Sequence, residues 1–265
     1  MVFEDDVTLV VGVDEKYFKQ LKTTFKLWLK FWPKLRSIDW LFFYDGKCPV
    51  LKDEIKALIQ EFRHYKTTTI QAWRPPDLNQ YEDQRDRMLT AWVYVPPMFV
   101  KTKYWLKLDV DAYPVRPIAG SFPNRRWFES KPAIVAHSWN YSKQRGTKGD
   151  WFKIFDEWGD HTALLACYAP LGLRFPVGSR RLSHKRIASY AAFFETEFTR
   201  DVATQCHRSS EEKFTIPIPS QDTFIWACAE RMGKQIVRVR MKRHGITNCP
   251  NFNKLKANVD ELMTI

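Results

Sequence analysis

Hydrophobic positions in the first 110 residues follow two different periods. Short runs rich in β-branched and aromatic residues predict buried strands, whereas apolar residues at three- and four-residue steps predict amphipathic helices. The predicted strands are 7–13, 40–44, 67–73 and 104–110, and the predicted helices are 18–32, 50–62 and 81–95. This alternation of strand and helix is typical of an α/β fold with a mostly parallel sheet.

After Pro117 the pattern is less regular. We expect strands at 133–136 and 236–239, helices at 151–158, near 189–194 and at 221–232, a polar loop rich in basic and aromatic residues at 139–149, and a short helix after residue 246. No change of composition marks a domain boundary. The sequence therefore predicts one domain over residues 1–265, with a regular first part, 1–117, and a less regular second part, 118–265.

Charge distinguishes the two parts of the chain. The 265 residues include 42 Lys and Arg against 30 Asp and Glu, a formal net charge of +12. Residues 1–120 hold 19 basic and 16 acidic side chains, whereas residues 121–265 hold 23 and 14. A folded chain this basic favours a polyanionic partner such as nucleic acid, an anionic membrane surface or a phosphorylated ligand, contacted through the second part.

Other features exclude several classes of protein. The five cysteines form no C-x-x-C pair, which argues against a disulfide scaffold or a cysteine-ligated zinc site and indicates a reducing, cytoplasmic setting. No apolar run approaches 18 residues, so we expect no membrane span. The glycine-rich dinucleotide motif, the P-loop motif and the G-x-S-x-G hydrolase motif do not occur.

Carboxylates stand where predicted strands end. Asp14, Asp45, Asp109 and Asp111 stand at the carboxyl ends of three of these strands, where ligands of α/β sheets bind. Asp109 and Asp111 form a D-x-D pair, and two carboxylates together with diphosphate oxygens suit Mn²⁺ or Mg²⁺. The alternative for such a short motif is a strand-end aspartate that caps a turn.

The run KTKYWLKLDVDAYP resembles the D-x-D strand of GT-A type glycosyltransferases. The opening VTLVVGVDEKYFKQLKTTFKLW is similar to the first strand and helix of that fold, so that the resemblance covers residues 7–117. It implies a GT-A-like Rossmann-type sandwich that transfers a sugar from a nucleotide-sugar donor, such as a UDP-sugar, to a hydroxyl group. Residues 1–117 would then bind the nucleotide-sugar and residues 118–265 the acceptor.

The resemblance also implies roles for single residues. Asp109 would lie near the ribose or the metal, and Asp111 would ligate the Mn²⁺ or Mg²⁺ that bridges the diphosphate. Asp14 would lie near the nucleotide base. Arg85 and Arg87, on the predicted helix before the D-x-D pair, would face the diphosphate or the sugar; the alternative for each is a solvated helix face.

Two later residues complete the implied site. His244 would be a third metal ligand, and the alternative is a histidine on an exposed loop. Asp222 would be the general base that deprotonates the acceptor, and the alternative is an N-terminal helix cap. Because Gln221 replaces the more usual acidic neighbour, the sequence leaves open whether the sugar is transferred with inversion or retention.

The second part also carries features expected of the acceptor side. Basic clusters include Arg125–Arg126, Arg180–Arg181 and Arg238–Arg243, and tryptophans are interleaved with them. Basic grooves with aromatic faces bind DNA backbones and extruded bases. The chain also looks like the phage GT-A enzymes that glycosylate 5-hydroxymethyl-pyrimidines in DNA, and this resemblance implies such a base as the acceptor. A polysaccharide or lipid-linked saccharide acceptor, and a non-catalytic nucleic-acid-binding protein, are the two alternatives.

Overall fold

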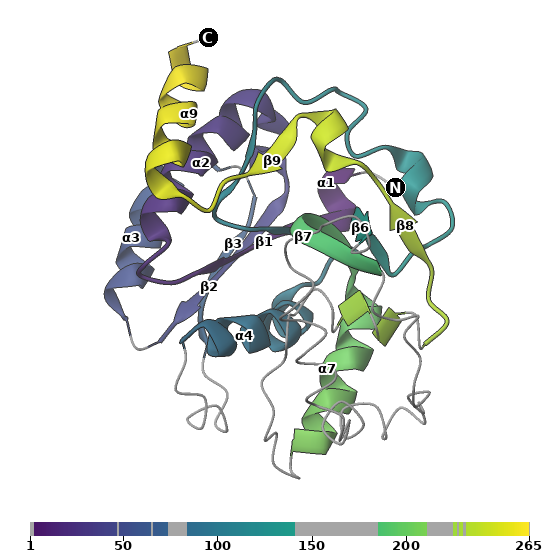
Figure 1. Ribbon diagram of the computed structural model, residues 1–265. Coiled ribbons are helices and arrows are strands. Elements are labelled where there is room, and N and C mark those ends of the chain that lie inside the picture. Colours follow the sequence, from purple (N-terminus) through teal and green to yellow (C-terminus); the bar gives the residue numbers. More distant parts are fainter. Residues whose placement is uncertain are drawn as a thin grey trace.

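The computed structural model describes residues 3–46, 48–64, 66–73, 84–140, 185–210, 225–226, 228–229 and 232–264. They form three layers, with a central sheet between two sets of helices (Figure 1). The strands of the sheet are β1 (Val7–Val13), β2 (Asp39–Asp45), β3 (Thr68–Trp73), β4 (Tyr104–Leu108), β6 (Ile134–Asn140), β7 (Lys185–Glu195) and β8 (Ile236–Arg238).

The strand order is β3-β2-β1-β4-β7-β6-β8. Within the described sheet every neighbouring pair is parallel except the two pairs that β7 makes, with β4 and with β6. The prediction of a mostly parallel α/β sheet is therefore confirmed.

Each face of the sheet is covered by its own helices. On one face lie α2 (Phe18–Phe31), the 3-10 helix η1 (Pro33–Ser37) and α3 (Val50–Glu61), while α4 (Gln84–Phe99) and α7 (Thr196–Ser210) cover the other (Figure 1). Successive residues of β1 alternate between the two cores: Leu9 and Val11 pack on the α2 side, and Val10 packs on the α4 side. Because both faces are covered, the strands read as continuous apolar runs.

The helix expected near 189–194 is wrong, because this segment belongs to strand β7. β7 lies between β4 and β6 in the middle of the sheet. Ala191 and Phe193 face one core, and Ala192 and Phe194 face the other. A strand buried on both faces has no polar alternation, so its apolar run cannot be told from a buried helix by period alone.

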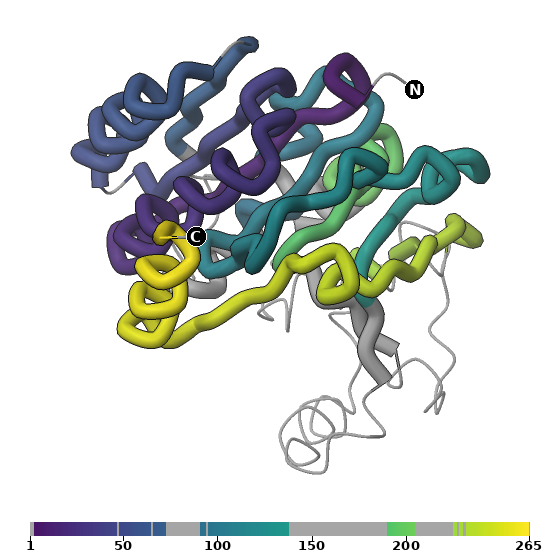
Figure 2. Tube along the Cα trace, turned by 90° about the horizontal axis from the view of Figure 1, so that it is seen from above, coloured from purple at the N-terminus to yellow at the C-terminus, as the bar shows by residue number. Residues whose placement is uncertain are grey.

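The end of the chain forms a small second sheet and a helix. Strand β5 (Ala112–Pro114) pairs antiparallel with β9 (Ile246–Asn248), which follows the 3-10 helix η7 (Met241–His244). The tail, expected to hold a short helix, forms the 13-residue helix α9 (Phe252–Thr264). α9 lies beside α2 (Figure 2), and Leu255 and Val259 pack against Leu27 and Phe31.

The remaining expectations have mixed outcomes. The strand expected at 133–136 is longer, since β6 reaches Asn140 and takes in the first residues of the expected loop. The rest of that loop, the helix expected at 151–158 and most of the helix expected at 221–232 lie outside the described residues; residues 225–226 and 228–229 are helical. Within the described ranges no helix is long and apolar enough to cross a membrane. The described elements also include the 3-10 helix η3 (Arg125–Phe128) and the short helix α1 (Phe3–Asp6).

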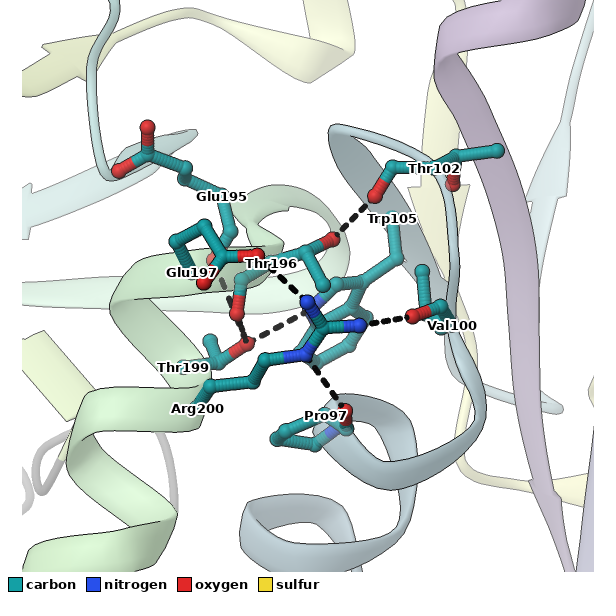
Figure 3. A network of polar contacts seen from close by, with 9 residues as sticks. All are labelled: Pro97, Val100, Thr102, Trp105, Glu195, Thr196, Glu197, Thr199 and Arg200. Atoms are coloured by element: carbon teal, nitrogen blue, oxygen red, sulfur yellow. Dashed lines mark hydrogen bonds and ion pairs between the residues drawn. The ribbon is translucent and has the colours of Figure 1, made fainter.

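One arginine joins the two helices on the α4 side of the sheet (Figure 3). Arg200 of α7 donates Nε to the carbonyl of Pro97 at 3.1 Å and Nη2 to that of Val100 at 2.7 Å. It also pairs with Glu197. The last carbonyls of a helix have no partner within the helix. The guanidinium therefore caps the carboxyl end of α4 and fixes it against α7.

Candidate functional site

The order of the strands creates a switch point between β1 and β4. From β1 the chain moves outward to β2 and β3, and it then returns to place β4 on the other side of β1. Asp14 directly follows β1, and Asp109 directly follows β4. Ligands of open α/β sheets bind in the crevice beyond the strand ends at such a point. Two of the candidate carboxylates therefore stand on the two sides of the expected crevice.

The D-x-D pair lies on a turn rather than on a strand. β4 ends at Leu108, two residues earlier than the sequence predicts, and the Asp109 N–H donates to the carbonyl of Tyr190 in β7 at 2.9 Å. The Ala112 N–H donates to the carbonyl of Asp109 at 3.0 Å, which closes the turn. Because the backbone turns here, the two carboxylates need not obey the side-to-side alternation of a strand.

Side chains of helix α2 hold this turn in place through hydrogen bonds. The Thr24 hydroxyl donates to the carbonyl of Val110 at 2.8 Å, and the Trp28 indole N–H donates to that of Ala112 at 2.8 Å. Gln20, one turn earlier, donates to the carbonyl of Pro250 at 3.2 Å. Three residues on one face of α2 therefore hold the D-x-D turn and the segment after β9 in a common position.

Asp111 sits where β5 and β9 meet. The Cys249 N–H donates to the Asp111 carbonyl at 3.1 Å, and the Asn248 side chain donates to its carboxylate. Burial raises the pKa of the Asp111 carboxyl, while the charge of Lys107 and the hydrogen bond from Asn248 act in the opposite direction. These contacts hold the Asp111 carboxylate in one orientation, but burial takes it partly out of water and so disfavours its charged form. A bound cation would stabilise that charged form.

Lys107 places a buried positive charge next to the Asp109 carboxylate. Its side chain is only 3% exposed, and its ammonium pairs with Asp109 at 2.5 Å. The ammonium also lies 4.7 Å from the centre of the Trp92 ring. A buried lysine is costly unless it is paired, so this ion pair and the aromatic face explain how the charge is retained in the core. The Asp109 side chain is 35% exposed.

Asp14 ends β1 beside a second carboxylate. Its Oδ1 accepts the Tyr17 N–H at 2.8 Å, a local turn that leads into α2. Burial raises the pKa of Asp14, and the nearby Asp45, at the end of β2, raises it further. Asp14 therefore caps the turn before α2 and directly follows β1, while its contact with the nucleotide base stays a prediction.

His244 lies away from the aspartates. It belongs to η7, at the end of the β5–β9 ribbon opposite to Asn248 and Asp111. Its ring packs on Phe122 at 5.5 Å and on Trp127 at 5.1 Å, and burial together with the Arg116 charge lowers its pKa. Its role as a third metal ligand stays a prediction, to which this position gives no support.

The other candidates are only partly visible. Arg85 and Arg87 lie in the first turns of α4, which follows β3 and so begins on the carboxyl side of the sheet; their side chains are outside the description. Asp222 lies outside the described residues. Sequence reasoning missed Lys107, Thr24 and Asn248 as partners of the D-x-D turn. Only Lys107 gave a signal, as a charged residue inside an apolar strand.

The donor set suits a hard divalent cation. Among the described residues no three His, Cys, Asp or Glu side chains cluster as a complete metal site. Two carboxylates remain, Asp109 and Asp111, with oxygen donors only. Mg²⁺ is usually held by one or two carboxylates together with substrate phosphates and water, and Mn²⁺ favours the same oxygen ligands. The two aspartates therefore fit a divalent metal ion whose remaining ligands would come from substrate phosphates and water.

Solved structures share this architecture. Core-mannan synthase A from Aspergillus fumigatus, in a form with Mn and GDP, superposes with a TM-score of 0.57 at 14% identity, over 87% of this chain and 72% of that one. The galactosyltransferase LgtC, in complex with donor and acceptor sugar analogues, gives 0.57 at 12% identity over 97% of both chains. Mouse xyloside xylosyltransferase 1 gives 0.51 at 11% identity, over 88% of this chain and 85% of that one.

These similarities define the fold. The chain has the GT-A architecture found in glycosyltransferases, as the resemblance of residues 7–117 implies. Comparison of the sequence with protein-family models and with curated proteins finds no match.

Proposed function

We propose that this chain is a metal-dependent glycosyltransferase, which moves a sugar from a nucleotide-sugar donor to a hydroxyl acceptor. One observation carries the proposal: a D-x-D turn, fixed from three sides, lies at the switch point of a GT-A sheet. The turn is held by β7, by α2 and by β9. Such extensive support is expected for a site whose ligands must be oriented before substrate arrives.

Asp109 and Asp111 would hold Mn²⁺ or Mg²⁺, with diphosphate oxygens completing the coordination. The cation would supply charge neutralisation to the diphosphate as it leaves. In this proposal Asn248 orients the Asp111 carboxylate, and Lys107 orients that of Asp109. Two of the structural neighbours are described with Mn and GDP or GDP-mannose, which supports a nucleotide-sugar donor; a UDP-sugar remains the expectation from sequence.

Further residues have roles within the same proposal. Asp14 would contact the nucleotide, and Arg85 and Arg87 would approach the diphosphate or sugar from the start of α4. Asp222 would take the proton of the acceptor hydroxyl. His244 could act as a metal ligand only after its ring leaves Phe122 and Trp127, so we base the metal site on the two aspartates.

The acceptor we propose is a 5-hydroxymethylated pyrimidine in DNA. The support is the net charge of +12 and its concentration in the second part of the chain. Work on DNA would take place in the cytoplasm, as the cysteine usage also indicates. A saccharide acceptor is the second candidate, favoured by the neighbour described with an acceptor sugar analogue.

A single transfer experiment tests donor and acceptor together. The protein is incubated with Mn²⁺, UDP- and GDP-sugars, and matched duplexes with cytosine, 5-hydroxymethylcytosine or 5-hydroxymethyluracil. The DNA is then digested to nucleosides for mass spectrometry, and free nucleoside diphosphate is measured in the same samples. We expect a mass gain of one sugar on a hydroxymethylated base only.

Two variants distinguish a glycosyltransferase from a non-catalytic DNA-binding protein. Asp111→Asn should abolish release of nucleoside diphosphate, whereas Asp201→Asn, at an exposed position of α7, should leave it unchanged. Donor hydrolysis without a modified base would move the acceptor to a saccharide. Neither transfer nor hydrolysis with any donor, with DNA binding that needs neither metal nor Asp111, would replace the proposal by a non-catalytic DNA-binding protein.

A further inference from the structure

Two segments far apart in the sequence meet at one corner of the molecule. The Arg116 guanidinium donates to the carbonyl of Arg243 at 2.8 Å, and the Val115 N–H donates to that of Gly245 at 2.7 Å. On the other side of η7, Trp127 of η3 packs against His244. These contacts gather six exposed cationic side chains, which we call the basic corner: Arg116, Arg125, Arg126, Arg240, Lys242 and Arg243.

Acidic residues are scarce along the two segments that carry the basic corner. Neither residues 112–128 nor residues 236–256 include an Asp or Glu, and the first of these segments is flanked by Asp111 and Glu129. Within the described part of the chain, Arg116, Arg240 and Arg243 form no ion pair with a carboxylate. Cations brought together at a cost in mutual repulsion indicate a surface made for an anion.

The fold gives this corner a rigid base. Phe122 is buried at its centre and contacts both Trp127, at 5.7 Å, and His244. Gly245 follows η7 with φ at 80°, and a Cβ there would lie 2.8 Å from Cγ of Arg116. Glycine therefore allows the Arg116 side chain to cross the backbone and reach Arg243.

The basic corner is also linked to the D-x-D turn. Strand β5 runs from Asp111 towards Arg116, and β9 returns beside it. The five residue steps from Asp111 to Arg116, at no more than about 3.3 Å each, span at most roughly 16 Å, which is about five base-pair steps along the axis of a DNA duplex. If the target nucleotide of a DNA strand lies at the D-x-D turn, the phosphates of nearby nucleotides would thus be within reach of the arginines of the basic corner.

We infer that the basic corner binds the backbone phosphates of a DNA duplex and so positions a target base at Asp109 and Asp111. This inference rests on the proposed DNA acceptor. Five of the six cations are arginine, whose planar guanidinium can bind phosphate through two hydrogen bonds. Contacts of this kind fix register and orientation and carry no sequence information.

A membrane surface fits the corner less well. Proteins that bind at the lipid interface insert exposed apolar side chains beside their basic residues. Among the exposed large apolar residues, only Val115, 39% exposed, belongs to the segments of the corner. The corner therefore offers charge with almost no apolar surface to insert.

The test measures DNA binding as a function of salt. A labelled duplex of about 24 base pairs is titrated by fluorescence anisotropy from about 50 to 300 mM KCl. The variant Arg240→Gln/Arg243→Gln is compared with Lys34→Gln/Lys52→Gln, which loses the same charge at exposed positions outside the corner. Two lost phosphate contacts should reduce the slope of log K against log salt by about 1.8 and weaken binding about tenfold.

The outcomes separate the surface from the proposed reaction. The inference is supported if the corner variant loses affinity and slope, the lysine variant does not, and both retain donor hydrolysis and their thermal midpoint. It is overturned if the wild type does not bind duplex DNA, if both variants bind equally well, or if vesicles rich in phosphatidylserine bind more tightly than DNA. If the wild-type protein does not hydrolyse any donor, the proposed enzymatic function is refuted, whereas the result on DNA binding remains valid.

Discussion

Gly12→Ala should destabilise the protein by filling a space that two aromatic rings already occupy. Gly12 lies directly opposite Phe43 in the β1–β2 pair. A Cβ on Gly12 would lie 2.6 Å from Cζ of Phe43 and 2.9 Å from Cζ2 of Trp92, where ordinary contacts begin at 3.4 Å. The two rings pack edge to face, with centroids 4.7 Å apart, and both are buried. Neither can move without displacing the core behind it.

The size of the effect follows from two opposing terms. Overpacking of a well-packed core costs about 1–3 kcal/mol. Because Gly12 does not have a positive φ, alanine also gains about 0.4–1 kcal/mol by restricting the unfolded chain. The net loss is about 1–2 kcal/mol, which for a chain of this length lowers the thermal midpoint by roughly 2–8 °C.

The assay is thermal and urea unfolding, with Gly120→Ala as the matched control. A Cβ on Gly120 would meet nothing within 4 Å, so this variant should keep or slightly raise the midpoint. Adding Phe43→Leu to Gly12→Ala removes the ring atoms that clash, and the two losses should then be less than additive. An unchanged midpoint for Gly12→Ala, or strict additivity in the double variant, would refute the packing argument.

Three further predictions follow from the contacts described above. Lys107→Met removes a buried cation beside the two aspartates, so Mn²⁺ affinity measured by calorimetry should rise roughly tenfold; a fall would mean that Lys107 serves only to hold Asp109 in place. Arg200→Met should cost about 1–3 kcal/mol of unfolding free energy in urea, because carbonyls at the end of α4 lose their donor; no change would show that water replaces the guanidinium. Burial lowers the pKa of His64, whose Nε2–H donates to the carbonyl of Ile38 at 2.6 Å. The unfolded chain therefore takes up the proton first, and stability should fall as pH drops below about 6.5; His64→Gln should flatten that part of the curve, and an equally steep loss in the variant would assign it to other groups.

The first part of the fold could be predicted because each element there has a clear period. The predicted strands and helices up to residue 110 correspond to β1, α2, β2, α3, β3, α4 and β4, with small shifts at their ends. β7 could not be predicted, because a strand buried on both faces carries no alternation. The β5–β9 pair has only three residues on each side, and its partner segments are more than 130 residues apart. No local pattern can encode such a pairing.

The site divides in the same way. The sequence suggests Asp109 and Asp111 as candidate ligands because they stand at the end of an apolar strand. It could not show that Thr24 and Trp28 hold the turn, since on a helical period both residues read as ordinary core positions. Nor could it show that His244 packs on Trp127, because that contact joins two short 3-10 helices, η7 and η3, that meet only in the folded chain.

The position of β7 also sets when the site can form during synthesis. β4 has β1 on one side and β7 on the other, and β7 begins at Lys185. When residues 1–117 have left the ribosome, the edge of β4 beside Asp109 is still open, and Asn248 has not been made. Nascent chains should therefore assemble the first three strands early and acquire an ordered D-x-D turn only after β7 and β9 have been made. Fragments that stop before β7 would expose a central strand edge and would be prone to pair with one another.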